Sequence, residues 1–408
     1  MEMIEIGQLA KKASQQLAQL TEEQTNEVLR AIASQLEEDA ETILAANAQD
    51  MAQAEKDGIE ASVQDRMLLT EDRLADMIDA VREIAKLPTP IGNVLTETTH
   101  AQGMSIEKTV VPLGVVAMIY EARPNVTVDA AALTFKTNNA VILRGSSSVL
   151  KTNMAMINSI QRALIAQRVD EHAIQLLTNT SYEFADQLLT LNGYVDVIIP
   201  RGGQGLIQNV VKKATVPVIE TGAGNCHLFI DEEANPSMAL NIALNAKLQR
   251  TSVCNAIETI LLHEKFDASP LLAELQKRNV RIYADDADLQ GEGVQPVAGW
   301  DTEFLNESVR LKRVASVEEA IEHINRYGTK HSEAIITENI AHANQFLQSV
   351  DASTVYHNVS TRFTDGFEFG FGAEIGISTQ KLHARGPMGL DALTSTKYIV
   401  RGNGQTRG

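Results

Sequence analysis

Short apolar segments alternate with helical patterns over most of the chain after Val110. A first series is formed by 114–120, 140–143, 195–199 and 216–219, and a second by 256–262, 280–283, 309–314, 334–336 and 354–357. Helical patterns such as 317–326 and 340–348 lie between them. Apolar strands that alternate with helices are typical of a parallel sheet covered on both faces. The 408 residues therefore predict an α/β protein with two doubly wound domains.

Three regions lie outside these two series. The first 86 residues are rich in Ala, Gln and Glu with apolar positions at helical spacing, which predicts several helices. Segments 95–110 and 394–400 are strand-like but fit neither core, and such strands often pair with each other or with another subunit. We expect helices and a cofactor-binding domain over 1–225 with an oligomerisation hairpin at 94–110, a catalytic domain over 226–385, and a C-terminal return with an oligomerisation strand over 386–408.

Charge and cysteine usage restrict the class of partner. The formal net charge of −18 argues against a general affinity for nucleic acid or an anionic membrane. No apolar run approaches the length that crosses a bilayer, and residues 1–20 lack a signal-peptide pattern. The two cysteines, Cys226 and Cys254, form no CxxC or Cys/His group, so neither a disulfide framework nor a metal site is indicated. We expect a cytoplasmic protein that acts on small molecules.

Cys254 lies where a helical pattern gives way to the strand-like run 256–262. A substrate can reach a thiol at such a junction, and the nearby Arg250 would favour the thiolate. The alternative is a buried cysteine that acts as a small hydrophobic residue. Local sequence leaves both interpretations open.

Two glycine-rich turns are candidate phosphate sites. The first, 200–205, follows the apolar run 195–199 and precedes the helical pattern 206–214. Glycines let backbone N–H groups approach a pyrophosphate, and a helix N-terminus favours negative charge. The spacing is not GxGxxG, so a plain structural turn is the alternative, and the same holds for 221–225. The chain has no GxxxxGK[ST] motif, which argues against nucleotide hydrolysis.

Several motifs together carry a family resemblance. They are 111–116 (VPLGVV), 120–125 (YEARPN), 219–227 (IETGAGNCH), the segment around Cys254, and 383–390 (HARGPMGL). With these the chain resembles the aldehyde dehydrogenase superfamily, most closely its gamma-glutamyl phosphate reductase branch. The resemblance implies that Cys254 is the nucleophile and that Asn125 stabilises the oxyanion. Glu220 lies 254 − 220 = 34 positions before Cys254, where the superfamily often carries a catalytic glutamate.

The reaction that the resemblance implies is NADPH-dependent reduction of L-glutamyl 5-phosphate to L-glutamate 5-semialdehyde through a cysteine thioester, the second step of proline biosynthesis. In that reaction water would waste the thioester, so the role of Glu220 stays open. An alternative is a non-phosphorylating semialdehyde dehydrogenase in which Glu220 activates water. A catalytically silent scaffold of the same fold is the third possibility.

The cofactor and substrate residues are expected from matched positions. Segment 140–148 corresponds to the adenosine-ribose loop, and its arginine and serines, without an acidic residue, favour NADPH over NADH. The expected cofactor residues are Arg144, Ser146, Ser147, Arg201, Gly202, Gly203, Gly222 and Glu303. The expected substrate residues are Arg123, His383 and Arg385, since arginine suits carboxylate and phosphate groups. We also expect a homo-oligomer, and a separately encoded glutamate 5-kinase is a possible partner.

Overall fold

The computed structural model describes residues 2–407, which divide into two compact units. Unit 1 contains the residues up to Glu220, Phe371–Gly376 and the residues from Met388 onward. Unit 2 contains Thr221–Gly370 and Ile377–Pro387. The sequence analysis placed the first boundary at 225/226 and a second at 385/386. The predicted C-terminal return at 386 lies close to the observed one at Met388, whereas the short return Phe371–Gly376 was not predicted, because six residues carry no compositional signal.

The N-terminal region is helical, as predicted. Its helices are α1 (Met3–Leu17), α2 (Glu22–Glu38), α3 (Ala40–Lys56), α4 (Ala61–Met67) and α5 (Glu71–Lys86). Helix α2 begins with a capping box, because the Thr21 hydroxyl accepts from the Gln24 N–H while the Gln24 side chain accepts from the Thr21 N–H.

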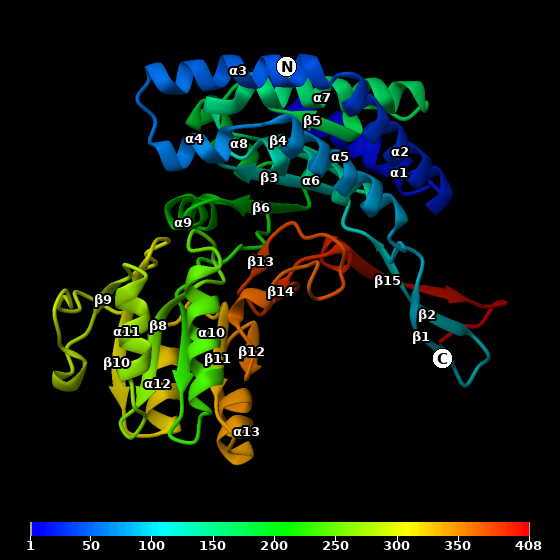
Figure 1. Ribbon diagram of the computed structural model, residues 1–408. Helices are drawn as coiled ribbons and strands as arrows, with labels where there is room; N and C mark the ends of the chain where they lie inside the picture. Colours follow the sequence, from blue (N-terminus) through cyan, green and yellow to red (C-terminus); the bar gives the residue numbers. More distant parts are fainter. Residues whose placement is uncertain (1, 408) are drawn as a thin grey trace. The chain divides into compact units, whose positions relative to one another are not determined.

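Unit 1 is built on a four-stranded parallel sheet with the strand order β5-β4-β3-β6 (Figure 1). The strands are β3 (Val115–Tyr120), β4 (Ala140–Arg144), β5 (Ile174–Leu176) and β6 (Val197–Arg201), and the helices are α6 (Pro124–Lys136), α7 (Leu150–Ala166), α8 (Tyr182–Leu189) and α9 (Gln204–Lys213). The chain adds β4 and β5 on one side of β3 and then β6 on the other. Ligands of such sheets bind beyond the carboxyl ends of the strands at this change of direction, here between β3 and β6.

In unit 1 one strand prediction was wrong and one strand was missed. The predicted strand 216–219 forms only an isolated bridge between Val218 and Ile198, because Pro217 has no N–H to donate to a ladder. The short strand β5 was not predicted, since its three residues carry no detectable pattern.

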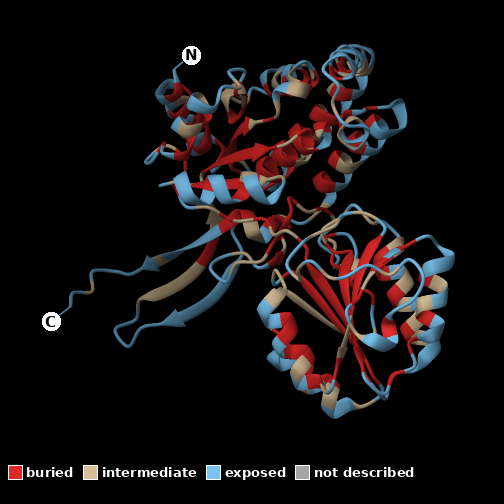
Figure 2. Ribbon diagram, turned by 90° about the vertical axis from the view of Figure 1, so that its left-hand side faces the viewer, coloured by how far each residue is buried: buried red, intermediate tan, exposed pale blue. Residues whose placement is uncertain are grey.

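A separate antiparallel sheet of unit 1 joins β1 (Val94–Thr99), β2 (Ser105–Pro112) and β15 (Thr394–Arg401) in the order β1-β2-β15. Of the two alternatives for segments 95–110 and 394–400, pairing with each other or with another subunit, the structure shows the first, with Tyr398 opposite Lys108. All six residues of β1 are exposed (Figure 2). The edges of this sheet, β1 and β15, are available for further pairing.

Unit 2 contains a six-stranded parallel sheet with the order β12-β11-β7-β8-β10-β9. Its strands are β7 (Cys226–Ile230), β8 (Ile257–His263), β9 (Arg281–Tyr283), β10 (Ser308–Val314), β11 (Ser332–Ile336) and β12 (Thr354–His357), and its helices are α10 (Pro236–Leu248), α11 (Ser269–Lys277), α12 (Val317–Tyr327) and α13 (Ile340–Ser349). Strand β7 was not predicted, because its first residues, Cys226 and His227, interrupt the apolar pattern.

Both faces of the unit 2 sheet are covered. Leu228 and Ile230 of β7 belong to the apolar cluster that includes α10 and α11, whereas Phe229 belongs to the cluster that includes α12 and α13. Successive strand residues point to opposite faces, so the helices lie on both sides of the sheet. The prediction of a doubly wound α/β fold is confirmed.

Short elements complete the described chain. A two-stranded antiparallel sheet is formed by β13 (Ile377–Ser378) and β14 (Gly386–Pro387). The 3₁₀ helices are η1 (Ser147–Val149), η2 (Glu171–Ala173), η3 (Ala287–Leu289), η4 (Thr361–Phe363) and η5 (Leu390–Leu393). Within residues 2–407, none of the helices combines the length and the apolar character that a membrane span requires.

Candidate active site

Cys254 lies in the loop between α10 and β8 and is half-buried. Its backbone carbonyl oxygen accepts a hydrogen bond from the thiol of Cys226, with a sulfur–oxygen distance of 3.2 Å. Cys226 is fully buried, and burial raises the pKa of its thiol well above the usual value. The two cysteines therefore differ in kind, and Cys254 is the one that solvent reaches.

The glycine turn before β7 packs directly against the Cys254 loop. A β-carbon on Gly224 would overlap the carbonyl group of Cys254, and a β-carbon on Gly222 would overlap the side chain of Thr379. The Gly224 N–H donates to Glu303 Oε1 at 2.8 Å, and burial raises the pKa of the Glu303 carboxyl. Close packing thus explains both glycines, and the turn brings the predicted residues Cys254, Gly222 and Glu303 into one neighbourhood of unit 2.

Arg362 is a cation of this neighbourhood that the sequence analysis missed. Burial lowers the pKa of Arg362, while the negative charge of the Cys254 thiolate acts in the opposite direction. Its guanidinium contacts the side-chain oxygen of Asn255 and donates from Nε to Gln249 Oε1 at 2.8 Å. Arg362 lies in η4, far along the chain and outside any motif, so no local pattern points to it. The exposed Arg250, which the sequence favoured, acts on Arg362 by repulsion.

Asn125 lies in the first turn of α6 in unit 1 and is exposed. Arg123 precedes the helix as its N-cap, and Pro124 occupies the first helical position, where its missing N–H costs nothing. The side-chain nitrogen of Asn125 donates to Asp129 Oδ2 at 3.2 Å. Burial raises the pKa of Asp129 to about 6, and the positive charge of Arg201 opposes that shift.

The glycine turn between β6 and α9 holds a carboxylate of the protein itself. The Gly203 N–H donates to Glu121 Oε1 at 3.0 Å. A β-carbon on Gly202 would lie 2.7 Å from the Glu121 carboxyl carbon, so Gly202 leaves room for this side chain. Glu121 follows β3 and the turn follows β6, which is the change of direction in the sheet. The N-terminus of α9 thus binds an anion, which fits the pyrophosphate of a dinucleotide, and Glu121 occupies that place here.

Arg144 ends β4 and is half-buried. Its Nη2 donates to the Thr180 carbonyl oxygen at 2.9 Å, whereas its buried Nε has no hydrogen-bond partner among the described residues. Burial lowers the pKa of Arg144. The Ser146 hydroxyl accepts from the Ser148 N–H, and Ser147 is exposed. A guanidinium with an unsatisfied donor, two residues before a serine-rich loop in the sequence, fits an anionic part of a cofactor.

The remaining predicted residues, Glu220, His383 and Arg385, lie in separate segments of the chain. Glu220 is half-buried in a loop and is the last residue of unit 1 before the chain first enters unit 2. His383 lies between β13 and β14 with a left-handed φ of 65°. Arg385 Nη2 contacts Asp351 Oδ1 at 2.7 Å, and Asp351 also pairs with Lys381 and Lys330. Arg385 therefore has a structural partner of its own in unit 2.

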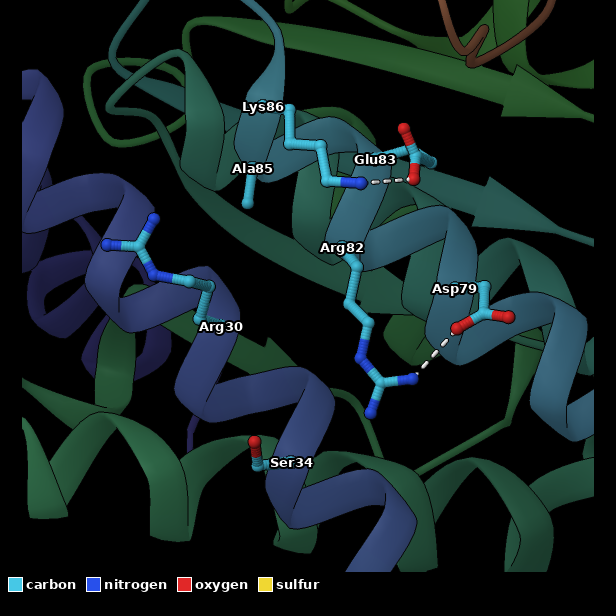
Figure 3. A pocket seen from close by; sticks show the side chains of 7 residues that line it. All are labelled: Arg30, Ser34, Asp79, Arg82, Glu83, Ala85 and Lys86. Carbon is cyan, nitrogen blue, oxygen red and sulfur yellow. Dashed lines mark hydrogen bonds and ion pairs between the residues drawn. The ribbon is translucent and has the colours of Figure 1, made fainter.

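A hollow of about 620 Å³ lies between α2 and α5 (Figure 3). It is lined by Arg30, Ser34, Asp79, Arg82, Glu83, Ala85 and Lys86. Arg82 pairs with Asp79 at 2.8 Å and Lys86 with Glu83 at 2.6 Å. The hollow includes none of the predicted site residues, and its cations are neutralised by neighbouring acids, so it is not the candidate active site.

The chain is similar to known proteins in both sequence and fold. The model of the aldehyde dehydrogenase family matches residues 2–298. The gamma-glutamyl phosphate reductase of Geobacillus kaustophilus is 53% identical over 410 residues, which cover 100% of this chain and 99% of the relative. The crystal structure of gamma-glutamyl phosphate reductase from Thermotoga maritima superimposes with a TM-score of 0.96 at 40% identity and covers 100% of both chains. An acetylating aldehyde dehydrogenase from Geobacillus thermoglucosidasius, with a TM-score of 0.72 at 16% identity over 99% of this chain and 97% of the other, shares the fold.

Proposed function

Since the chain belongs to the aldehyde dehydrogenase family, we propose that it reduces L-glutamyl 5-phosphate to L-glutamate 5-semialdehyde and phosphate, the second step of proline biosynthesis. The observation that carries the proposal is similarity over the full length to gamma-glutamyl phosphate reductases. The half-buried Cys254, with a cation beside it, supports the chemistry.

Cys254 acts as the nucleophile. Its thiolate attacks the acyl carbon, a carbon–sulfur bond forms, and the carbon–oxygen bond to phosphate breaks as the tetrahedral intermediate collapses to a thioester. Arg362 favours the thiolate through its positive charge. Phosphate is a good leaving group, so this step needs little acid assistance.

Asn125 donates its side-chain N–H to the oxyanion that forms on the substrate during this attack. A donor of this kind is worth about 3 kcal/mol of transition-state stabilisation. Its exposed position in the first turn of α6 leaves the amide accessible to a ligand.

A nicotinamide cofactor, when bound, supplies the hydride that reduces the thioester. Arg144, Ser146 and Ser147 hold its adenosine ribose, and the positive charge of Arg144 selects the 2′-phosphate of NADPH. Arg201, Gly202 and Gly203 would hold its pyrophosphate, and Gly222 and Glu303 would hold its nicotinamide ribose. Cys254 is released as the free thiol when the semialdehyde leaves.

Charged residues near the motifs bind the substrate. Arg123 and His383 recognise its carboxylate and phosphate groups, and Arg385 contributes positive charge while it holds Asp351. Glu220 lies 34 positions before Cys254 in the sequence. It assists proton transfer, orients the cofactor or is held away from water, whereas in the alternative non-phosphorylating reaction it would activate water. The exposed edges of the β1-β2-β15 sheet suit a homo-oligomer. Cytoplasmic location and docking of glutamate 5-kinase stay predictions.

The test is NADP⁺ reduction with glutamate 5-semialdehyde, the reverse direction, with and without inorganic phosphate. We expect activity only with phosphate, since phosphate must cleave the thioester in this direction. Activity without phosphate would instead show hydrolysis and would replace the proposal with a non-phosphorylating dehydrogenase, tested next with Glu220→Gln.

A further inference from the structure

We propose that Asp129 is a positioning residue that orients the side-chain amide of Asn125 so that its nitrogen, and not its oxygen, faces the reacting carbonyl. The inference rests on the proposed function, because it concerns the oxyanion donor of that reaction.

The helix geometry brings the two side chains together. Asn125 and Asp129 are four residues apart on α6, so they lie on the same face of the helix. The side-chain nitrogen of Asn125 donates to Asp129 Oδ2 at 3.2 Å. Asn125 is exposed, and this contact is what restrains its side chain.

The chemistry of the pair fixes the orientation of the amide. An ionised carboxylate only accepts hydrogen bonds, so it selects the NH₂ end of the amide and excludes the carbonyl end. The NH₂ group has two N–H bonds, of which Asp129 uses one and the second stays available to an oxyanion. A flipped amide would present its oxygen to the oxyanion and repel it.

The surroundings of Asp129 supply a pH signature for this role. Burial raises the pKa of its carboxyl to about 6, and Arg201 at the end of β6 is the charged group that acts on it from a neighbouring element. Below that pKa the carboxyl gains an O–H that can donate to the amide oxygen, so the selection between the two amide ends is lost. The Asn125 amide is therefore held with its NH₂ group toward the oxyanion only above about pH 6.

A double-mutant cycle tests the inference. The readout is the burst of nitrophenolate when p-nitrophenyl acetate acylates Cys254, which requires neither the cofactor nor the glutamyl substrate. We expect Asp129→Ala to lower the acylation rate constant about tenfold, a fraction of the loss on removal of a whole oxyanion donor. In an Asn125→Ala background the same substitution should have no further effect, because the residue acts through Asn125. An equal tenfold loss in both backgrounds, or no loss in either, overturns the inference.

Two further measurements separate positioning from folding. Asp129→Asn keeps the size of the side chain, but its amide both donates and accepts hydrogen bonds at every pH, as the protonated Asp129 does. The ratio of the wild-type to the Asp129→Asn acylation rate constant should therefore rise as the pH increases through about 6, where Asp129 ionises. A ratio independent of pH contradicts the inference even where Asp129→Ala fails to fold. Asp79→Ala, which removes an exposed acid of α5, is the matched control and should acylate at the wild-type rate. If the wild-type protein does not reduce NADP⁺ with glutamate 5-semialdehyde, the proposed function is wrong, but the nitrophenolate burst still tests the role of Asp129.

Discussion

The backbone carbonyl group of Cys254 occupies the space that a β-carbon on Gly224 would need. The glycine turn before β7 and the cysteine loop before β8 are thus fitted together without room for a side chain. The position of Cys254, the proposed nucleophile, therefore depends on a residue in a different motif.

Gly224→Ala should displace the Cys254 loop, since the overlap is with backbone and not with a flexible side chain. A displacement of about 1 Å at a reacting group can cost about 10²-fold in rate. We expect a loss of that size in kcat and a changed rate of Cys254 alkylation by iodoacetamide. Gly291→Ala is the matched control, because the nearest atom to its β-carbon would be 3.9 Å away. Full activity in Gly224→Ala would contradict the observed packing.

The two cysteines should respond differently to substitution. Cys254→Ala should abolish turnover while leaving NADPH binding measurable. Cys226→Ala should retain most activity, because the buried thiol of Cys226 contacts the Cys254 carbonyl and His331 Nδ1 but does not attack the substrate. Loss of these contacts should lower the free energy of unfolding by about 1 kcal/mol. In the folded protein a thiol reagent should label Cys254 first and Cys226 only on unfolding, since Cys226 is fully buried. Mass spectrometry of the labelled peptides gives the order.

Glu121→Gln should strengthen binding of the dinucleotide. The Glu121 carboxylate accepts from the Gly203 N–H at the N-terminus of α9, the place expected for the pyrophosphate, so two anions compete for it. Removal of one charge should lower the Kd of NADPH several-fold, about 1 kcal/mol for one helix-terminus charge. Fluorescence titration measures this Kd without turnover. An unchanged Kd would place the pyrophosphate elsewhere.

Glu258→Gln should destabilise unit 2 strongly. Lys247 Nζ contacts Glu258 Oε2 at 2.9 Å, and both side chains are fully buried. Burial disfavours the charged form of Lys247 and lowers its pKa. Without its ion-pair partner, the buried ammonium group of Lys247 costs about 3–5 kcal/mol of stability. Urea denaturation followed by circular dichroism measures the change. The double substitution Lys247→Met with Glu258→Leu should recover most of the stability, and failure to recover would show that the pair has a further role.

His323→Phe should reduce the sensitivity of stability to acid. Burial lowers the pKa of His323 to about 3, and its ring lies edge-on to Trp300 at 4.9 Å. The unfolded state therefore binds a proton below pH 6.5 that the folded state excludes until about pH 3, so the stability from this group is complete above pH 6.5 and is lost as pH falls. At pH 5 the loss is about 2 kcal/mol, which His323→Phe should avoid. Thermal unfolding at pH 5 and pH 8 measures it.

His342 provides the control with the opposite sign. The hydrogen bond that His342 Nδ1–H donates to the Asp231 carboxylate raises the pKa of His342. The contribution of this pair to stability is therefore present below the unfolded pKa and is lost as the pH rises through the folded pKa. His342→Gln should lower the Tm at pH 5 more than at pH 8. A greater loss for His342→Gln at pH 8 would contradict this assignment.

Apolar patterning predicted the fold because the buried strands of a doubly wound sheet are apolar on both faces. Strands β3, β4, β8 and β10 were predicted close to their observed bounds for this reason. The prediction failed where that reason did not hold: at β7, which begins with Cys226 and His227, and at 216–219, where Pro217 interrupts the ladder. Pairing of 95–110 with 394–400 was one of two alternatives that the sequence left open, because both segments lack a partner in either core, and the structure shows that pairing as antiparallel.

The sequence by itself determined the fold class and the residue types of the candidate chemistry, because motifs such as YEARPN and the segment around Cys254 are contiguous in the chain. Only the tertiary structure decided which partners these residues have. The contacts of Arg362 with Asn255 next to Cys254, of Glu121 with the N-terminus of α9 and of Asp351 with Arg385 join residues far apart in sequence. Such contacts depend on strand order and loop packing, which leave no periodic signal in the chain.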